Sequence, residues 1–174
     1  LTRSAFAAGE PELAERFARR DLEIRRRSQQ VTDAELAVPL HSLADLLYSR
    51  GKYQEAESLY DEALLIREQL YLPTDRRISE TLGRLAVLKA IRGAYRESDP
   101  LFRQALQATE DLYGPDHPAV ARVLNDLAES LFAQAKYDQA RRTLDRALRI
   151  QVAALRPTDQ SLGRTRNNLA AIYV

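Results

Sequence analysis

The sequence predicts an all-α protein built as a solenoid of antiparallel helix pairs. The main support is a period of 42 residues, which places leucine at five equally spaced positions: Leu1, Leu43, Leu85, Leu127 and Leu169. A fixed period of about 20–50 residues is typical of stacked units, because each unit leaves an apolar face that only a neighbouring copy can cover. Within each period, two stretches with the apolar spacing of a helix are separated by a short break.

The first helix of each pair is clearest where Leu40, Leu43 and Leu47 lie at helical spacing. It ends at the break Arg50-Gly51-Lys52, because glycine commonly interrupts helices. The second helix runs from Tyr53 to near Leu70. The same break recurs with Gly93 and, in the following copy, with alanine.

The longer connection between pairs is the turn-rich stretch Leu72-Pro73-Thr74-Asp75, which supplies a cap for the next helix. We therefore expect copies at about 34–75, 76–117 and 118–159, with partial copies at 1–33 and 160–174. Both ends fall within incomplete copies, which predicts a piece of a longer array. We expect frayed or self-associating ends, since the following residues lack a covering partner: Leu1, Phe6, Leu169, Ile172 and Tyr173.

Small residues recur where neighbouring helices must approach closely, for example Ala63 and its equivalents one and two periods later. Prolines disturb the pattern at Pro39 and Pro100. Because proline inside a helix removes a hydrogen bond and clashes with the preceding turn, we expect one helix to begin later, at Asp99-Pro100.

These features carry a family resemblance. The pattern Leu43-Ala44, Gly51, Tyr53, Ala56, Tyr60, Ala63 and Pro73 resembles the tetratricopeptide repeat in a long, 42-residue form. The stretches Tyr53–Glu68 and Tyr113–Pro118 are similar to the kinesin-light-chain type of that repeat, and Asn167-Asn168-Leu169-Ala170 is similar to the start of its first helix. The resemblance covers essentially the whole chain and implies a right-handed superhelix. It also implies a scaffold protein, of a kind that occurs in bacteria and eukaryotes. We expect a bacterial origin.

Composition excludes several function classes. The chain has no cysteine, so disulfides, thiolate catalysis and cysteine metal sites are excluded. Basic and acidic residues nearly cancel, 26 against 25, so no strong field favours nucleic acid or an anionic membrane. No apolar run approaches the roughly 18–20 residues that span a bilayer, and no signal-peptide pattern begins the chain. We expect a cytoplasmic protein that binds neither membrane nor nucleic acid and carries no cofactor.

Candidate chemistry is sparse, which predicts that the chain is not an enzyme and has no catalytic residues. His117 lies in a connection, where we expect it to pack the loop. His41 and Asp45 are four residues apart and share a helix face, but two ligands do not make a closed metal site, so a polar pair is the better interpretation. The arginines between Arg16 and Arg27 alternate with acidic residues, as on a solvated helix face, and lack the aromatic side chains that stack on bases.

The resemblance implies that first helices line a concave groove. Polar side chains beside the Leu-Ala pair suit peptide recognition, since amides bond an extended backbone and arginines hold carboxylates. The predicted groove residues are His41, Asp45, Tyr48, Arg84, Arg122, Asn125, Glu129, Phe132, Arg164, Asn167 and Asn168. Of these we expect the asparagines to hold the ligand backbone, the arginines to engage acidic groups, and the two aromatic residues to make apolar contact.

We therefore expect a non-enzymatic scaffold that binds a peptide or protein segment in this groove. An alternative is an assembly or regulatory module that packs on another domain of its own protein, or on another copy, through the outer faces of the second helices. An ordinary hydrated surface is the alternative for any single residue of the groove.

Overall fold

A computed structural model describes residues 11–28, 32–156 and 158–172. The described residues form eight α-helices and divide into two compact units, residues 1–72 and 73–174. Each unit is described by itself. The all-helical, repeated architecture expected from the sequence is confirmed, whereas the grouping of the copies into one array with the boundaries given above stays a prediction.

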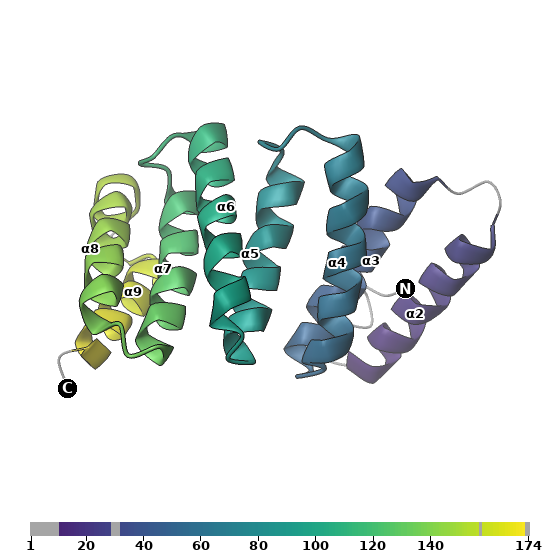
Figure 1. The fold of residues 1–174 in the computed structure, drawn as a ribbon, viewed down its shortest axis with the longest axis horizontal. Helices are drawn as coiled ribbons and strands as arrows, with labels where there is room; N and C mark the ends of the chain where they lie inside the picture. Colours follow the sequence, from purple (N-terminus) through teal and green to yellow (C-terminus); the bar gives the residue numbers. More distant parts are fainter. Residues whose placement is uncertain (1–10, 29–31, 157, 173–174) are drawn as a thin grey trace. The chain divides into compact units, whose positions relative to one another are not determined.

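Unit 1 contains α2 (Pro11–Arg27), α3 (Asp33–Ser49) and α4 (Tyr53–Leu70). Helices α3 and α4 form an antiparallel pair, and α2 packs against α3 (Figure 1). The second helix of the pair has the bounds that the sequence predicted.

Unit 2 contains α5 (Arg76–Ile91), α6 (Tyr95–Tyr113), α7 (Pro118–Ala133), α8 (Tyr137–Ala154) and α9 (Gln160–Ile172). Helices α5 and α6 form one pair and α7 and α8 the next, while α9 packs on both α7 and α8 (Figure 1). First helices are also neighbours, because α7 contacts both α5 and α9.

The turn inside each pair uses one residue with positive φ. Gly51 and Gly93 have φ values of 73° and 75°, which glycine adopts without steric cost. Ala135 occupies the same place with φ 57° and is the one non-glycine residue with positive φ among those described. The recurrence of glycine at this position therefore reflects the need for a residue with positive φ in the turn.

The connection between pairs caps the helix that follows. The Asp75 side chain accepts a hydrogen bond of 2.8 Å from the Arg77 N–H at the start of α5. His117 does the same for α7, where its Nδ1 accepts from the Ala119 N–H at 3.1 Å, and its ring stacks on Tyr113 with centroids 4.6 Å apart. The predicted cap and the predicted loop-packing role of His117 are both confirmed.

The core of each pair places a large side chain beside small ones. Tyr60, Phe102 and Leu144 occupy equivalent positions and are each almost completely buried. Alanines one turn before and after them are also inaccessible, which allows paired helices to approach closely. The buried alanines are Ala56, Ala63, Ala105, Ala140 and Ala147.

The prediction that a helix begins at Asp99-Pro100 is wrong. Helix α6 begins at Tyr95, in register with α4 and α8, and contains Pro100; α3 likewise contains Pro39. A helical proline leaves the carbonyl four residues earlier without its N–H partner, here those of Arg96 and Glu35. Both of these residues are exposed, so water can satisfy the freed carbonyls.

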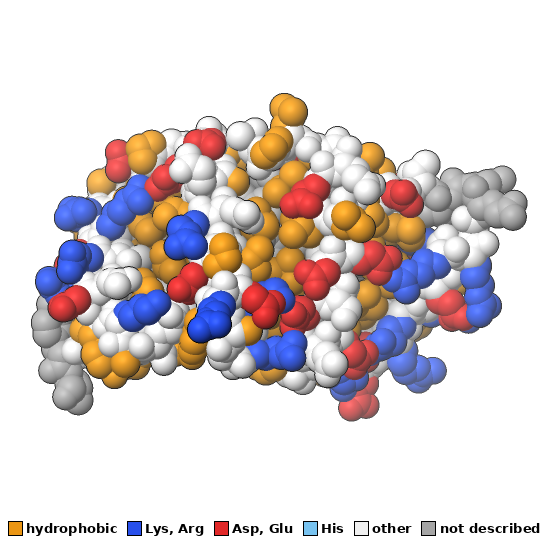
Figure 2. Space-filling model, in the orientation of Figure 1, with side chains coloured by type: hydrophobic (Ala, Val, Ile, Leu, Met, Phe, Trp, Pro, Cys, Tyr) orange, Lys and Arg blue, Asp and Glu red, His pale blue; other side chains and the backbone are white. Residues whose placement is uncertain are grey.

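The arginines of α2 pair with acidic side chains, as the alternating sequence predicted. Arg25 bonds Asp21 at 2.8 Å, and Arg20 and Arg27 lie 3.0 and 2.7 Å from Glu23. On the face drawn in Figure 2, basic and acidic side chains likewise lie interspersed. Within the described ranges, no helix combines the length and apolar character needed to cross a bilayer.

Of the residues expected at uncovered ends, Leu1, Phe6 and Tyr173 lie outside the described residues. Leu169 and Ile172 are partly buried against the cluster that α7 and α8 form around Leu131 and Leu144. These two side chains are therefore partly covered, and self-association of the ends stays a prediction.

Candidate functional site

The exposed side chains of α5, α7 and α9 form the candidate site in unit 2, which we call the first-helix face. The 42-residue period puts residues of these three helices at equivalent positions. Arg122 of α7 corresponds to Arg164 of α9, and the carboxylates Asp126 and Glu129 of α7 correspond to Arg84 and Val87 of α5. The contact between α7 and α9 can therefore be compared with that between α5 and α7.

Between α7 and α9, the polar groups satisfy one another. The Arg164 guanidinium donates to Asp126 at 2.6 Å and to Glu129 at 2.8 Å. Asn168, one turn further along α9, donates to the same Glu129 oxygen at 2.8 Å. Three predicted groove residues (Glu129, Arg164 and Asn168) are thus brought together, but they are bound to each other and to Asp126.

Burial raises the pKa of Asp126 above its ordinary value, although the nearby charge of Arg164 and, to a smaller extent, that of Arg122 act in the opposite direction. Burial also lowers the pKa of Arg164, but the two carboxylates more than offset this and the net shift is upward. The arginine therefore stays charged, and the aspartate bears the cost of removing the pair from water.

Asn125, which was predicted to hold the backbone of a ligand in the groove, does not face solvent. Its side chain is 2% exposed and donates to the Ala121 carbonyl at 2.8 Å. The Thr165 hydroxyl of α9 lies 3.0 Å from Asn125 Oδ1 and 2.7 Å from Gln151 Oε1 of α8. A buried amide needs hydrogen-bond partners, and Asn125 has them in α7 and α9, so its side chain is not available to a ligand.

Between α5 and α7, the equivalent arginine has no such partners. Arg122 is exposed and forms no hydrogen bond or close ion pair among the described residues, although its charge acts on Asp126 one turn further along α7. It lines a cavity of about 270 Å³ together with Arg76 and Glu80 of α5 and the stacked Tyr113 and His117. The one ion pair within the cavity lining is long, 3.8 Å between Arg76 Nε and Glu80 Oε1.

The remaining candidates of unit 2 are exposed. Arg84 and Asn167 lie at the surface of α5 and α9. Phe132 is 40% exposed and packs edge-on against Tyr137, with ring centroids 5.3 Å apart. A ligand of unit 2 could reach all three side chains.

In unit 1, the three candidates of α3 contact α4. His41 lies 3.1 Å from an Arg67 guanidinium nitrogen, 3.6 Å from Asp45, and edge-on to the Tyr60 ring. Asp45 also accepts a 2.5 Å hydrogen bond from the Tyr60 hydroxyl. The Tyr48 ring packs against Tyr53. The predicted polar pair is thus part of the packing between α3 and α4.

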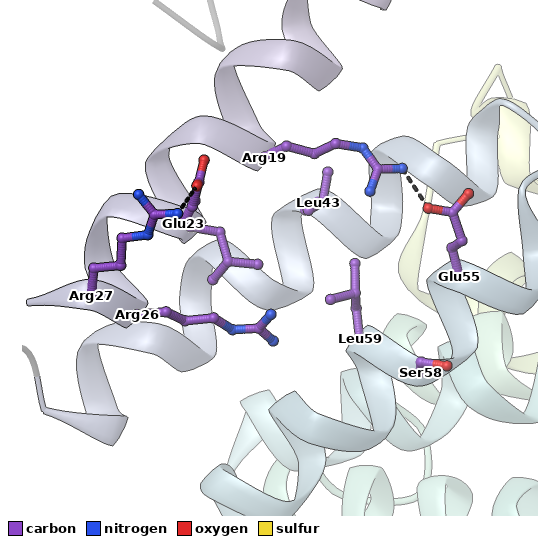
Figure 3. A pocket seen from close by; sticks show the side chains of 9 residues that line it. Arg19, Glu23, Arg26, Arg27, Leu43, Glu55, Ser58 and Leu59 are labelled. Carbon is purple, nitrogen blue, oxygen red and sulfur yellow. Dashed lines mark hydrogen bonds and ion pairs between the residues drawn. The ribbon is translucent and has the colours of Figure 1, made fainter.

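Sequence reasoning missed a cavity of about 580 Å³ between α2, α3 and α4 (Figure 3). Leu22, Leu43 and Leu59 provide its apolar side, and charged pairs border it. Arg19 extends from α2 to Glu55 of α4 at 2.5 Å, and Arg26 pairs with Glu62 of α4. The available signal in the sequence was the recurrence of an arginine and a glutamate 36 residues apart, at 19 and 55 and again at 26 and 62.

A second missed feature links α2 in unit 1, and α6 in unit 2, to the turn of the helix pair that follows it, and we call it the inter-copy clasp. In unit 1, Glu15 of α2 is buried and accepts from Lys52 at 2.8 Å and from Arg50. In unit 2, the equivalent Asp99 of α6 accepts from Gln134 at 3.0 Å and from Lys136 at 3.4 Å. An acidic residue recurring at 15, 57 and 99 was the signal for it.

No group of three or more histidine and acidic side chains that could hold a metal ion occurs in the part of the chain that the structure describes. The polar groups on the first-helix face are donors and acceptors suited to noncovalent binding. Their arrangement offers hydrogen bonds and charge to an external chain.

Comparison with known proteins agrees with this architecture. BtubC (BKLC) from P. vanneervenii superposes with a TM-score of 0.86 at 23% identity, over 99% of this chain and 69% of that one. A Podosopora anserina protein with nearly identical TPR-like repeats, described as a kinesin light chain, gives 0.81 at 20% identity, over 99% and 82% of the two chains. At these identities the likeness shows the fold. A search of curated protein sequences gives no significant match.

The sequence profile of the tetratricopeptide repeat matches residues 35–106 and 77–151. These matches cover more than half of the chain and span both units. Such repeats generally form scaffolds for protein–protein interaction and are typically non-enzymatic. The chain belongs to the tetratricopeptide repeat family, as its kinesin-light-chain-like pattern indicated.

Proposed function

We propose that this protein binds a peptide or an extended protein segment on the first-helix face of unit 2. The observation that carries the proposal is Arg122, an exposed guanidinium at the edge of a cavity with no hydrogen-bond or ion-pair partner among the described residues. Arginine offers several donors in a fixed geometry, so an unpaired one on a scaffold is suited to recognition.

The binding surface differs from the set expected from the sequence. Arg164, Glu129 and Asn168 join α7 to α9, and Asn125 is buried between them. The predicted side chains that remain exposed for a ligand in unit 2 include Arg122, Phe132 and Asn167. Asn167 is an exposed amide that can bond an extended backbone, and Phe132 supplies apolar contact area.

The test begins with peptides selected from a random library on the whole protein. Arg122→Ala and Asn167→Ala should each weaken the selected peptides by roughly 10-fold, which corresponds to the usual net value of one or two hydrogen bonds. Arg142→Ala is the matched control, because Arg142 is an exposed arginine of α8 that has no ion pair among the described residues.

Loss of capture in Arg142→Ala with full capture in Arg122→Ala and Asn167→Ala would contradict the proposal. That result would favour the alternative of an assembly module that uses the outer faces of the second helices. Molar mass by light scattering, measured on the same variants, separates self-association from binding of a foreign peptide.

A further inference from the structure

We infer that the connection between α6 and α7 contains a pH-sensitive helix cap: His117 caps α7 when its ring is neutral and releases the start of the helix when the ring is protonated (Figure 1). This response goes beyond the proposed function, because it concerns the start of a helix rather than a bound peptide. Three helix starts in unit 2, which the 42-residue period makes equivalent, support it.

The same cap occurs at the start of α5, α7 and α9. In each case one side chain accepts a hydrogen bond from the backbone N–H two residues later, at 2.8, 3.1 and 2.9 Å respectively. The capping residues are Asp75, His117 and Asp159, each one period from the next. The three caps therefore share their geometry but differ in the chemistry of the acceptor.

The acceptors lose their function in different ranges of pH. A carboxylate remains an acceptor until it is protonated, which for aspartate occurs near pH 4. Hydrogen bonds from the Ser161 hydroxyl and backbone N–H lower the pKa of Asp159 further. Histidine is the side chain whose charge changes between about pH 5 and 8. The cap of α7 is therefore the one of these three that responds to mild acid.

Protonation removes the acceptor of this cap completely. A proton from solvent binds the Nδ1 lone pair that the Ala119 N–H uses, and His117 is exposed, so solvent reaches it. Both ring nitrogens of an imidazolium are donors, so a flip of the ring cannot restore the bond. The new positive charge also lies at the N-terminus of α7, where the helix dipole disfavours it.

The charged groups beside the connection do not reverse this effect. Besides the stacked Tyr113, they are three basic and three acidic side chains from the connection and from α5 to α8: Arg76, Arg122, Arg146, Glu80, Glu110 and Asp116. Arg146 donates to the Pro115 carbonyl of the connection and pairs with Glu110 at 2.6 Å. Because the charges nearly cancel, the lost acceptor decides how the cap responds.

The experiment follows three equivalent backbone amides, those of Arg77, Ala119 and Ser161, by NMR of the whole ¹⁵N-labelled protein between about pH 8 and pH 5. We expect the Ala119 amide proton to move upfield in step with the titration of the His117 ring, as its hydrogen bond is lost. The Arg77 and Ser161 amide protons should not move in this range, because their acceptors are carboxylates. At the upper pH, the ring ¹⁵N signals of His117 should show the proton on Nε2.

Two variants separate the cap from the charge of the ring. His117→Asp gives α7 the cap of α5 and α9, so its Ala119 signal should be constant over this range of pH. His117→Phe keeps a ring to stack on Tyr113 but has no acceptor, so its Ala119 signal should lie at the acid position at every pH. Because the other titratable groups are common to both proteins, the melting temperature of His117→Asp relative to wild type should rise by about 2–4 °C as the pH falls from 8 to 5.

The inference is overturned if the neutral His117 ring carries its proton on Nδ1, or if the Ala119 signal does not follow the ring. It also fails if Arg77 and Ser161 shift in parallel with Ala119, or if His117→Asp keeps the full titration of Ala119. A melting-temperature difference that is the same at both ends of the pH range would contradict it as well.

Discussion

Thr165 of α9 and Asn125 of α7, 40 residues apart in the sequence, meet in a buried hydrogen bond of 3.0 Å. Gln151 of α8 completes the arrangement at 2.7 Å from the same hydroxyl. A buried hydrogen-bond network therefore connects three helices of unit 2. The period and the apolar spacing alone would predict hydrophobic side chains at these positions.

Asn125→Ala should destabilise unit 2 by about 1–3 kcal/mol, because it removes the two hydrogen bonds of a buried amide, those to the Ala121 carbonyl and to the Thr165 hydroxyl. Chemical denaturation followed by circular dichroism measures the change. Arg122→Ala, an exposed substitution three residues away, should stay within about 0.5 kcal/mol of the wild type. Equal stability of both variants would show that the buried network contributes nothing.

Arg164→Ala should loosen α9 without unfolding the rest of unit 2. The variant removes the bonds to Asp126 and Glu129, and the expected effect is at most about 1 kcal/mol because the side chain is partly exposed. Amide hydrogen exchange should accelerate in α9 and remain unchanged in α5 and α6. Arg166→Ala, on the same helix but without an ion pair among the described residues, should have no effect on exchange.

Glu15 makes the stability of unit 1 depend on pH. Burial alone would raise its pKa, but hydrogen bonds and charge from Lys52 and Arg19 lower the pKa below 4.5. A depressed pKa in the folded state stabilises the protein above the unfolded pKa, and the contribution disappears as the pH falls through the folded value. The stability difference between wild type and Glu15→Gln should therefore be full at neutral pH and vanish in acid. Thermal unfolding at a series of pH values tests this, and a difference independent of pH would contradict it.

Ala135→Gly should stabilise the turn between α7 and α8. Positive φ costs a residue with a Cβ about 1–2 kcal/mol, whereas exchanging alanine for glycine costs about 0.4–1 kcal/mol through the unfolded chain. The net gain in the free energy of unfolding is therefore between about 0 and 1.6 kcal/mol, roughly 0.8 kcal/mol from the middle of the two ranges. Gly93→Ala is the reverse control and should destabilise, since no atom lies within 4 Å of its new Cβ and only the backbone is strained. We expect the denaturation midpoint to rise in Ala135→Gly and to fall in Gly93→Ala, each relative to the wild type.

The period and the apolar spacing predicted the helices, because both report packing that recurs in every copy. The bounds of α4, the turn at Gly51 and the cap at Asp75 all follow from residues near each other in the sequence. Pro100 misled the prediction of α6, since the helix start is set by register with the neighbouring copies, and the exposed Arg96 carbonyl tolerates the missing donor.

The candidate site was harder to predict, because the period shows which positions recur but not which of them meet. Asn125 and Asn167 are equivalent by period, yet one is buried and the other exposed. The difference depends on Gln151 and Thr165, which come from other helices. Arg122 and Arg164 are also equivalent by period and both exposed, but only Arg164 bonds carboxylates of the preceding first helix.

The inter-copy clasp has a consequence for how such a chain can change length. Each clasp takes its acid from one copy and its donors from the next, at positions fixed by the period. Removal of residues 76–117 would bring Glu57 into the sequence position of Asp99, ahead of Gln134 and Lys136. The two copies brought together by the deletion would still place an acidic residue at the position that accepts from a lysine. Whole copies can therefore be lost or duplicated by recombination while the contact between neighbouring copies is kept.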